Sequence, residues 1–273
     1  MRGNLRWGTG VSLPSNKEGF FVFRDFHAPG RSAVYAPHVM AATSHPLATN
    51  AALEILREGG TAVDAAVAAM AVHSVVEPHM TGIGGDCFAI VAQPDGTLSG
   101  MNSSGRAAKN VSADKLIADG LLDITPDSIH AVTVPGALRG WEKLLKDHGR
   151  FSFDKVLKRA IGYAREGYAV LPRVAFDWKH AVDHLKRDEA ASEMFLKEGR
   201  APVDGEVMRN PQLARTLEAV ANGGADAFYL GPVAEEIAAV VQSKGGYLTA
   251  EDLAAHEAVD VTPVTTDYRG ITV

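Results

Sequence analysis

Apolar residues recur at helical spacing from residue 46 onward. The period over 46–58 predicts an amphipathic helix, which the pair Gly59-Gly60 ends because glycine permits a left-handed cap. A second predicted helix over 62–76 is almost uniformly small and apolar, a pattern typical of a helix buried on all sides. A short apolar strand is predicted ahead of both helices, at 39–43.

A β-hairpin is predicted after the second helix. Residues 87–92 and 98–102 have strand character and flank Asp95-Gly96, a dipeptide that favours a tight turn. A polar loop that contains Ser104 and Arg106 then leaves the second strand. Because loops at the ends of rigid elements often bind ligands, the Arg106 guanidinium is predicted to lie at a binding position.

Gly82, Gly84 and Gly85 are crowded where the buried helix passes into the first strand. Glycine allows positive φ and lets another backbone or a ligand approach closely. A dinucleotide-binding turn needs a strand that feeds a helix, whereas here a helix feeds a strand, so this interpretation fails. We therefore interpret the three glycines as a structural turn that positions the hairpin and the loop after it.

The rest of the chain is predicted to be mostly helical. The helix ranges are 112–119, 136–148, 153–166, 173–186, 211–222, 232–243 and 250–255. Alternation over 261–273 predicts a strand. Residues 1–33 have little periodicity and are expected to form an N-terminal arm, which leaves 34–273 as the main region.

Composition narrows the kinds of partner. The formal net charge of −6 gives no basic surplus, so a nucleic-acid partner is not expected. Cys87 is the single cysteine, so no internal disulfide, cysteine-bound metal or cofactor is expected. No apolar run reaches the roughly 18 uncharged residues of a membrane span. The N-terminus lacks the features of a secretory signal, so a cytoplasmic location is expected, with a periplasmic or secreted one open if a signal was removed.

The serines and the cysteine of this region are weak candidates for a nucleophile. Ser103 and Ser104 are not part of a Gly-x-Ser-x-Gly elbow, and their favoured role is turn capping, although His79 and His130 stay open as partners. Cys87 begins an apolar strand, where cysteine is more often a small buried hydrophobe than a reactive thiolate.

Two other groups are better candidates for chemistry. Glu77 and His79 could form an acid–base pair, or they could equally cap the end of a helix. Arg106, next to serines and a glycine, can hold a carboxylate in a bidentate grip, and its alternative role is a surface ion pair.

Motifs along the whole main region resemble those of the gamma-glutamyltransferase (gamma-glutamyltranspeptidase) family. In chain order they are Ser44-His-Pro-Leu-Ala, Gly59-Gly-Thr-Ala-Val-Asp-Ala-Ala, Val76-Glu-Pro, Gly82-Ile-Gly-Gly-Asp, Ser104-Gly-Arg-Ala, Val134-Pro-Gly-Ala, Ala164-Arg-Glu-Gly-Tyr, Asn210-Pro-Gln-Leu-Ala-Arg-Thr-Leu, Asp226-Ala-Phe-Tyr, Gly245-Gly-Tyr-Leu-Thr-Ala-Glu-Asp-Leu and Asp267-Tyr-Arg-Gly. The chain is therefore identified as similar to the N-terminal, large-subunit portion of this family.

The resemblance implies an N-terminal nucleophile hydrolase of the α+β class, a four-layer αββα sandwich. This chain would supply the N-terminal part of the sandwich and an additional, mostly helical region. In the family, a precursor cuts itself and the new N-terminal threonine of the small subunit is the nucleophile, with its own α-amine as base. The resemblance places that threonine downstream, so no catalytic residue is expected in this chain. The implied partners are the small catalytic subunit from the same precursor and a small-molecule amide.

One position departs from the family pattern. Glutathione-type members hold the glutamyl carboxylate with an arginine that aligns with Ser104, whereas here Arg106 follows two residues later. At about 3.3 Å per extended residue, this shift moves the guanidinium by several ångströms. We expect Arg106, helped by Ser104, to hold a substrate carboxylate in a γ-glutamyl-type compound. The alternatives are a related amidase or acylase with a non-glutamyl substrate and a non-catalytic scaffold protein.

Overall fold

The hairpin predicted from the sequence forms two strands of a three-stranded antiparallel sheet in the computed structural model, which describes residues 34–273. Strand β1 (Cys87–Ala92) pairs with β2 (Leu98–Ser103), and β2 pairs with β5 (Val259–Val261), in the order β1-β2-β5. The register places Cys87 opposite Ser103, so the loop after β2 starts beside the start of β1. The N-terminal arm predicted at 1–33 lies outside the described residues.

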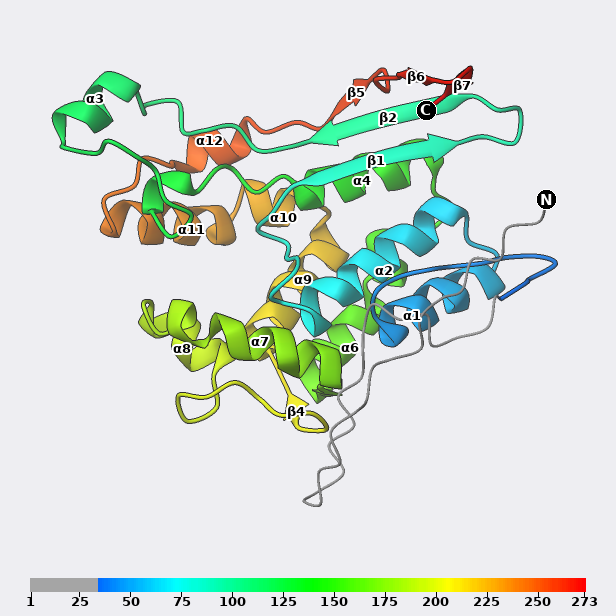
Figure 1. The fold of residues 1–273 in the computed structure, drawn as a ribbon, viewed down its shortest axis with the longest axis horizontal. Helices are drawn as coiled ribbons and strands as arrows, with labels where there is room; N and C mark the ends of the chain where they lie inside the picture. Colours follow the sequence, from blue (N-terminus) through cyan, green and yellow to red (C-terminus); the bar gives the residue numbers. More distant parts are fainter. Residues whose placement is uncertain (1–33) are drawn as a thin grey trace, which may run out of the picture. The chain divides into compact units, whose positions relative to one another are not determined.

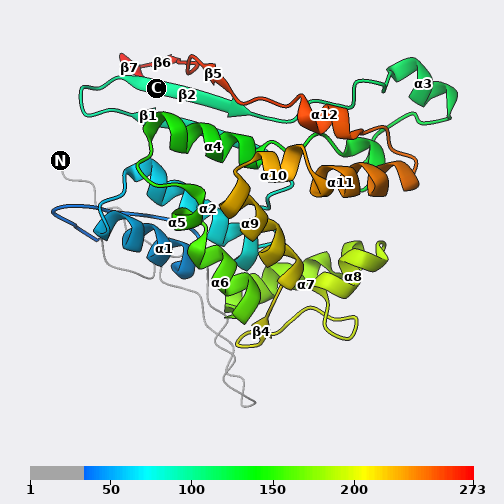
Figure 2. The same ribbon diagram turned by 180° about the vertical axis from the view of Figure 1, so that it is seen from behind.

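One face of this sheet is covered and the other is open. Helix α4 (Ala137–His148) packs against β1 and β2, and it lies between the sheet and helix α2 (Ala62–Val76) (Figures 1 and 2). Along β1, alternate side chains face α4 and join the core. The opposite face exposes Phe88 by 66% and Ile90 by 70%. Within residues 34–273, no element covers these two side chains.

Local signals account for the first two helices. Helix α1 (Pro46–Arg57) begins after His45, whose Nδ1 accepts the Leu47 N–H at 3.1 Å. Helix α2 begins with a capping box, in which Thr61 and Asp64 accept each other's backbone N–H groups. Nearly every side chain of α2 is buried, as its uniform apolar pattern predicts.

Asp64 also ties α2 to the segment after α4. Its buried carboxylate accepts the backbone N–H groups of Arg150 and Phe151 at 3.0 and 3.1 Å. A buried carboxylate needs such partners, because an unpaired one would lose its hydration without compensation. Asp64 therefore joins the start of α2 to the turn that follows α4.

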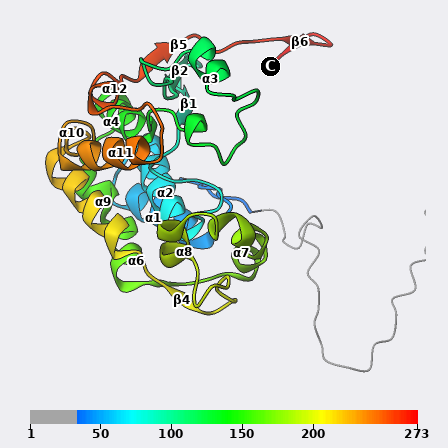
Figure 3. The same ribbon diagram turned by 90° about the vertical axis from the view of Figure 1, so that its left-hand side faces the viewer.

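Most of the remaining helices follow the predicted ranges closely. They are α3 (Ala113–Ala118), the short 3₁₀ helix η1 (Ile129–Ala131), α5 (Phe153–Val156), α6 (Lys158–Glu166), α7 (Pro172–Leu185), α8 (Glu189–Phe195), α9 (Pro211–Gly223), α10 (Asp226–Tyr229), α11 (Pro232–Ser243) and α12 (Ala250–Ala254). The predicted helix over 153–166 is divided at Leu157, and η1, α8 and α10 were not predicted. Helix α6 packs on both α2 and α9, while α7, α8 and β4 (Val207–Met208) lie on the far side from the sheet (Figure 3).

Of the two single-strand predictions, the one at 39–43 was wrong and the one at 261–273 was confirmed only in part. Residues 39–43 are irregular, with Val39 and Met40 exposed, and no strand among the described residues pairs with them. The range 261–273 contains the end of β5 and a separate hairpin of β6 (Asp267–Tyr268) and β7 (Ile271–Thr272). Another two-stranded pair joins β3 (Tyr168–Ala169) to β4.

The described residues agree with the α+β class and the helix-rich region that were predicted. Residues His38–Val273 form one unit by their internal contacts. Among the helices described, none has both the length and the apolar character needed to span a bilayer.

Candidate functional site

The loop that follows β2 is fixed by three backbone hydrogen bonds. Asn102 Oδ1 accepts the Ser104 N–H at 2.8 Å, and Asp86 Oδ1 accepts the Gly105 N–H at 2.8 Å. The Arg106 carbonyl oxygen accepts the N–H of Val134 at 3.0 Å. The backbone of the loop is thus held from three directions, while the Arg106 side chain is exposed.

Close packing at two glycines brings this loop against the start of α4. A Cβ on Gly105 would overlap the carbonyl oxygen of Val134, and a Cβ on Gly136 would overlap the carbonyl oxygen of Ser103. Only glycine fits at either position without a backbone shift. These are the glycines that the geometry of the loop requires.

Below the loop, Ser103 is bonded to two residues that are distant in sequence. Its hydroxyl donates to the Gly136 carbonyl oxygen at 2.7 Å, and His256 Nε2 lies 3.1 Å from the same Oγ, 153 residues away. Because the single hydroxyl proton goes to Gly136, His256 must donate from Nε2. Both Ser103 and His256 are buried.

Tyr229 and Arg139 support the His256 ring. The rings of His256 and Tyr229 stack with centroids 5.9 Å apart, and the Arg139 guanidinium lies 4.7 Å from the Tyr229 centroid. Burial, followed by the positive charge of Arg139, lowers the pKa of His256. The imidazole is therefore neutral at pH 7. Sequence reasoning missed His256 because nothing in its local pattern indicates Ser103 as a partner.

The predicted glycine turn lies beside this loop. The Gly85 carbonyl oxygen accepts the N–H groups of Gly136 and Ala137, both at 2.9 Å, which docks the turn on the first turn of α4. None of Gly82, Gly84 and Gly85 has positive φ, so the turn does not use the left-handed conformation that glycine permits.

Space does not explain these three glycines either. A Cβ on Gly84 would meet no atom within 4 Å, and on Gly82 or Gly85 it would meet only backbone atoms at 4.0 and 3.5 Å. Within the described residues, the turn is tied to the loop through Asp86 and not through close approach at a glycine. Its role in the site stays a prediction.

Glu77 and His79 do not form the pair that the sequence left open. Glu77 Oε2 accepts from Ser44 Oγ and pairs with His73 Nδ1, both at 2.6 Å. His79 instead lies 3.5 Å from a carboxylate oxygen of Asp177. The two side chains have different partners, so the acid–base hypothesis has no support from the geometry.

Among the described residues, neither Ser103 nor Cys87 has a base that would activate it as a nucleophile, because the Ser103 hydroxyl proton goes to the Gly136 carbonyl oxygen. Ser103 is bonded to His256 and not to His79 or His130, and His130 stacks on Tyr247 with centroids 5.4 Å apart. Burial raises the pKa of the Cys87 thiol to about 11, which keeps it protonated at neutral pH.

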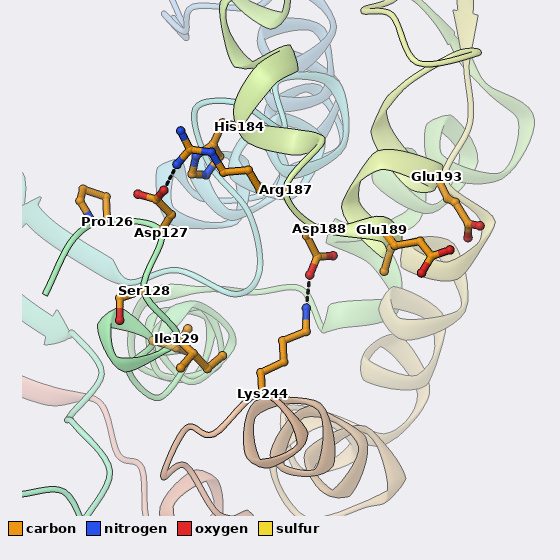
Figure 4. Close-up of a pocket in the computed structure, with 12 residues that line it drawn as sticks. Pro126, Asp127, Ser128, Ile129, His184, Arg187, Asp188, Glu189, Glu193 and Lys244 are labelled. Carbon is orange, nitrogen blue, oxygen red and sulfur yellow. Dashed lines mark hydrogen bonds and ion pairs between the residues drawn. The ribbon is translucent and has the colours of Figure 1, made fainter. Parts of the chain in front are cut away.

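A pocket of about 880 Å³ lies away from Ser103, Ser104 and Arg106 (Figure 4). It lies between the segment that joins α7 to α8, the residues around η1, and Lys244 after α11. Its cations are already paired, Arg187 with Asp127 and Lys244 with Asp188. Neither Ser104 nor Arg106 lines it. Among residues 34–273, no cluster of His, Cys, Asp and Glu has the arrangement of a metal site.

Comparison with known proteins gives the family. The family described as Gamma-glutamyltranspeptidase matches residues 48–273. The glutathione hydrolase-like YwrD proenzyme of Bacillus subtilis is 38% identical over 86% of this chain and 45% of its own length. The oxamate amidohydrolase proenzyme of Klebsiella pneumoniae is 36% identical over 87% of this chain and 46% of its own length.

Solved structures give the same result. The crystal structure of a cephalosporin acylase from Bacillus halodurans superposes with a TM-score of 0.86 and 41% identity, over 92% of this chain and 48% of that chain. The chain spans less than half the length of each of these three proteins. The α+β fold class predicted from the motifs is confirmed, with the described residues forming the large-subunit part of an N-terminal nucleophile hydrolase fold. The chain belongs to the gamma-glutamyltranspeptidase family.

Proposed function

We propose that this chain is the large-subunit portion of a self-processing enzyme that hydrolyses or transfers the acyl group of a small, carboxylate-bearing amide. Arg106, helped by Ser104, binds the carboxylate of the substrate. The nucleophile is a threonine supplied by the rest of the precursor, after the precursor has cut itself. The proposed partner is the small subunit released by that cut.

The observation that carries this proposal is the exposed Arg106 on a backbone held from three sides. None of the ion pairs between described residues involves Arg106, so its guanidinium is available to a ligand carboxylate. A cation on a rigid backbone loses little conformational freedom when it binds an anion. The alternative of a surface ion pair gains no support from the described residues.

The open face of the sheet supports the proposed subunit partner. Phe88 and Ile90 on β1 are joined there by Val259 and Val261 on β5, which the register places in line with them across β2. An apolar sheet face of this kind is stable when another layer packs on it. The remaining part of the precursor is the occupant that the four-layer fold requires.

A second candidate is an amidase with a shorter acyl group. Ser104 stands where glutathione-type members of the family hold the glutamyl carboxylate, and Arg106 follows it. Two of the similar proteins are named for oxamate and for cephalosporins. The scaffold alternative is disfavoured, because relatives that cover most of this chain are named as hydrolase proenzymes.

The test uses the full-length, self-cleaved enzyme. Intact mass should show two subunits, and steady-state kinetics should then be measured on a γ-glutamyl anilide, on oxamate and on an acylated β-lactam. Arg106→Ala should raise KM for the best anionic substrate about tenfold or more, because a charge-assisted hydrogen bond contributes about 1.5–3 kcal/mol. Arg57→Ala, at the exposed end of α1, is the matched control.

Two results would overturn the proposal. One is an unchanged KM in Arg106→Ala, and the other is a full-length protein that stays uncut. Turnover of oxamate or the β-lactam without turnover of the glutamyl anilide would select the second candidate. The cytoplasmic location stays a prediction, which fractionation of cells that express the full-length gene would test.

A further inference from the structure

The buried bond between Ser103 and His256 lies directly under the proposed carboxylate site. We propose that His256 is a positioning residue: its Nε2–H holds Ser103 and thereby fixes the loop that presents Ser104 and Arg106 to the substrate. This inference rests on the proposed function, because it assigns a role in binding the same carboxylate.

Ser103 is held at the end of β2 by hydrogen bonds on two sides. It is the last residue of β2 and is only 1% exposed, so its hydroxyl is shielded from bulk water. The hydroxyl donates to Gly136 and accepts from His256, which satisfies it from two sides. Removing the imidazole would leave a buried hydroxyl without its donor, and the end of β2 would relax to find another.

Different segments of the chain hold different parts of the loop. Asp86 holds Gly105 from the glycine turn, and Val134 holds the Arg106 carbonyl oxygen from the segment before α4. His256, between α12 and β5, holds Ser103 from the C-terminal side, and farther along the same segment Asp252 of α12 accepts the Lys109 N–H at 3.0 Å. The bonds from Asp86 and Val134 lie beyond Ser103, so neither of them fixes the end of β2 as His256 does.

The His256 ring is itself held in place. It stacks on Tyr229, whose hydroxyl donates to the Pro135 carbonyl oxygen at 2.7 Å. Pro135 directly precedes Gly136, the second partner of Ser103. His256 is 7% exposed, so its ring is locked by packing as well as by its hydrogen bond. Because the ring cannot move, its N–H fixes the position of the Ser103 hydroxyl. A positioning residue needs this property.

The charges near the ring fit this role. Arg139, Asp86, Arg106 and Glu257 all act on the His256 imidazole, and Arg139 and Arg106 favour its neutral form. A neutral ring can donate from Nε2 without competing with Arg106 for a carboxylate. The imidazole therefore serves as an oriented hydrogen-bond donor and not as a second cation of the site.

The test is kinetic and uses the full-length, self-cleaved enzyme with its best anionic substrate. His256→Phe keeps an aromatic ring for stacking on Tyr229 but removes the donor, and should raise KM about 5- to 50-fold with kcat changed less than about threefold. His256→Gln places an N–H near the position of Nε2, and should return KM to within about threefold of the wild-type value. His180→Phe, on the exposed surface of α7, is the matched control.

A double-mutant cycle separates this inference from the proposed function. In an Arg106→Ala background, His256→Phe should change KM less than about twofold, because the charged group that it positions is gone and only Ser104 is left. If Arg106→Ala raises KM but His256→Phe does not, the positioning role is overturned and the proposed function stands. If Arg106→Ala itself has no effect, the proposed function fails.

Ser103→Ala covers the case in which His256→Phe does not fold. It removes the same hydrogen bond with a smaller change in volume and should also raise KM more than kcat falls. An unchanged KM in a folded Ser103→Ala enzyme would overturn the inference. Equal effects of His256→Phe and His256→Gln would also do so, since they would mean that ring shape and not the donor matters.

Discussion

The carboxylate of Asp86 accepts a hydrogen bond from the backbone N–H of Gly105 at 2.8 Å. This bond joins the glycine turn to the loop that carries Arg106, across 19 positions of sequence. Gly105 lies between Ser104 and Arg106, so the contact links the turn to the residues proposed to bind substrate.

The Asp86–Gly105 bond predicts an effect on binding more than on turnover. Asp86→Ala should raise KM of the full-length enzyme for its anionic substrate about three- to tenfold, because the Gly105 N–H loses its acceptor. Asp86→Asn keeps an oxygen acceptor and serves as the matched variant, with a smaller rise expected. Equal KM values for wild type and Asp86→Ala would contradict the link.

Gly105, which packs closely against Val134, and Gly84, which has open space around it, are predicted to respond differently to substitution by alanine. Gly105→Ala should destabilise the full-length enzyme by about 1–3 kcal/mol, because its Cβ would overlap the Val134 carbonyl oxygen. Gly84→Ala should stay within about 0.5 kcal/mol, since its Cβ would meet no atom within 4 Å. Thermal and denaturant unfolding of both variants would measure this. A large loss of stability in Gly84→Ala would mean that another part of the protein approaches that position.

The buried residues His45, His73 and Glu77, with Ser44 bonded to Glu77 from the surface, predict a loss of stability in acid. Burial opposes the change, but hydrogen bonds from His73 and Ser44 leave the pKa of Glu77 below its ordinary 4.5. Burial lowers the pKa of His45 below 6.5. In both cases the unfolded chain binds more protons than the folded one, so stability falls as pH decreases, first below about 6.5 and again below about 4.5.

The acid response can be assigned with one variant. Thermal unfolding between pH 4 and pH 8 should show a steeper decline below about 4.5 in the wild type than in Glu77→Gln, which cannot titrate. Glu77→Gln should also be less stable at pH 7, because the amide is a weaker acceptor for His73 and Ser44. Parallel pH profiles for the two proteins would exclude Glu77 as the source.

Cys87 is predicted to be unreactive at neutral pH. Burial raises the pKa of its thiol to about 11, so the thiolate that reacts with iodoacetamide is scarce at pH 8. Mass spectrometry of the peptide that contains Cys87 should show slow labelling of the native enzyme and fast labelling after denaturation. Fast labelling of the native protein at pH 8 would contradict this environment.

Local elements could be predicted from the sequence because their signals are local. The helices α1 and α2 and the β1–β2 hairpin match their predicted ranges to within a residue, with caps at His45 and Thr61. The strand predicted at 39–43 failed because a strand needs a partner, and its own residues do not specify one. Helix α8 was missed, although Asp188 caps its first turn.

The sequence by itself determined the family, through motifs kept in order, and it located Ser104 and Arg106 on a loop after a strand. Only the tertiary structure decided which groups meet: Ser103 with His256, Asp86 with Gly105, and Glu77 with His73 and Ser44 instead of with His79. It also showed that close backbone contacts require glycine at positions 105 and 136. Among residues 34–273, no such contact requires it at Gly82, Gly84 or Gly85. The physical reason is that helices and turns depend on neighbours in the chain. Buried hydrogen bonds and close backbone contacts instead depend on how distant segments pack.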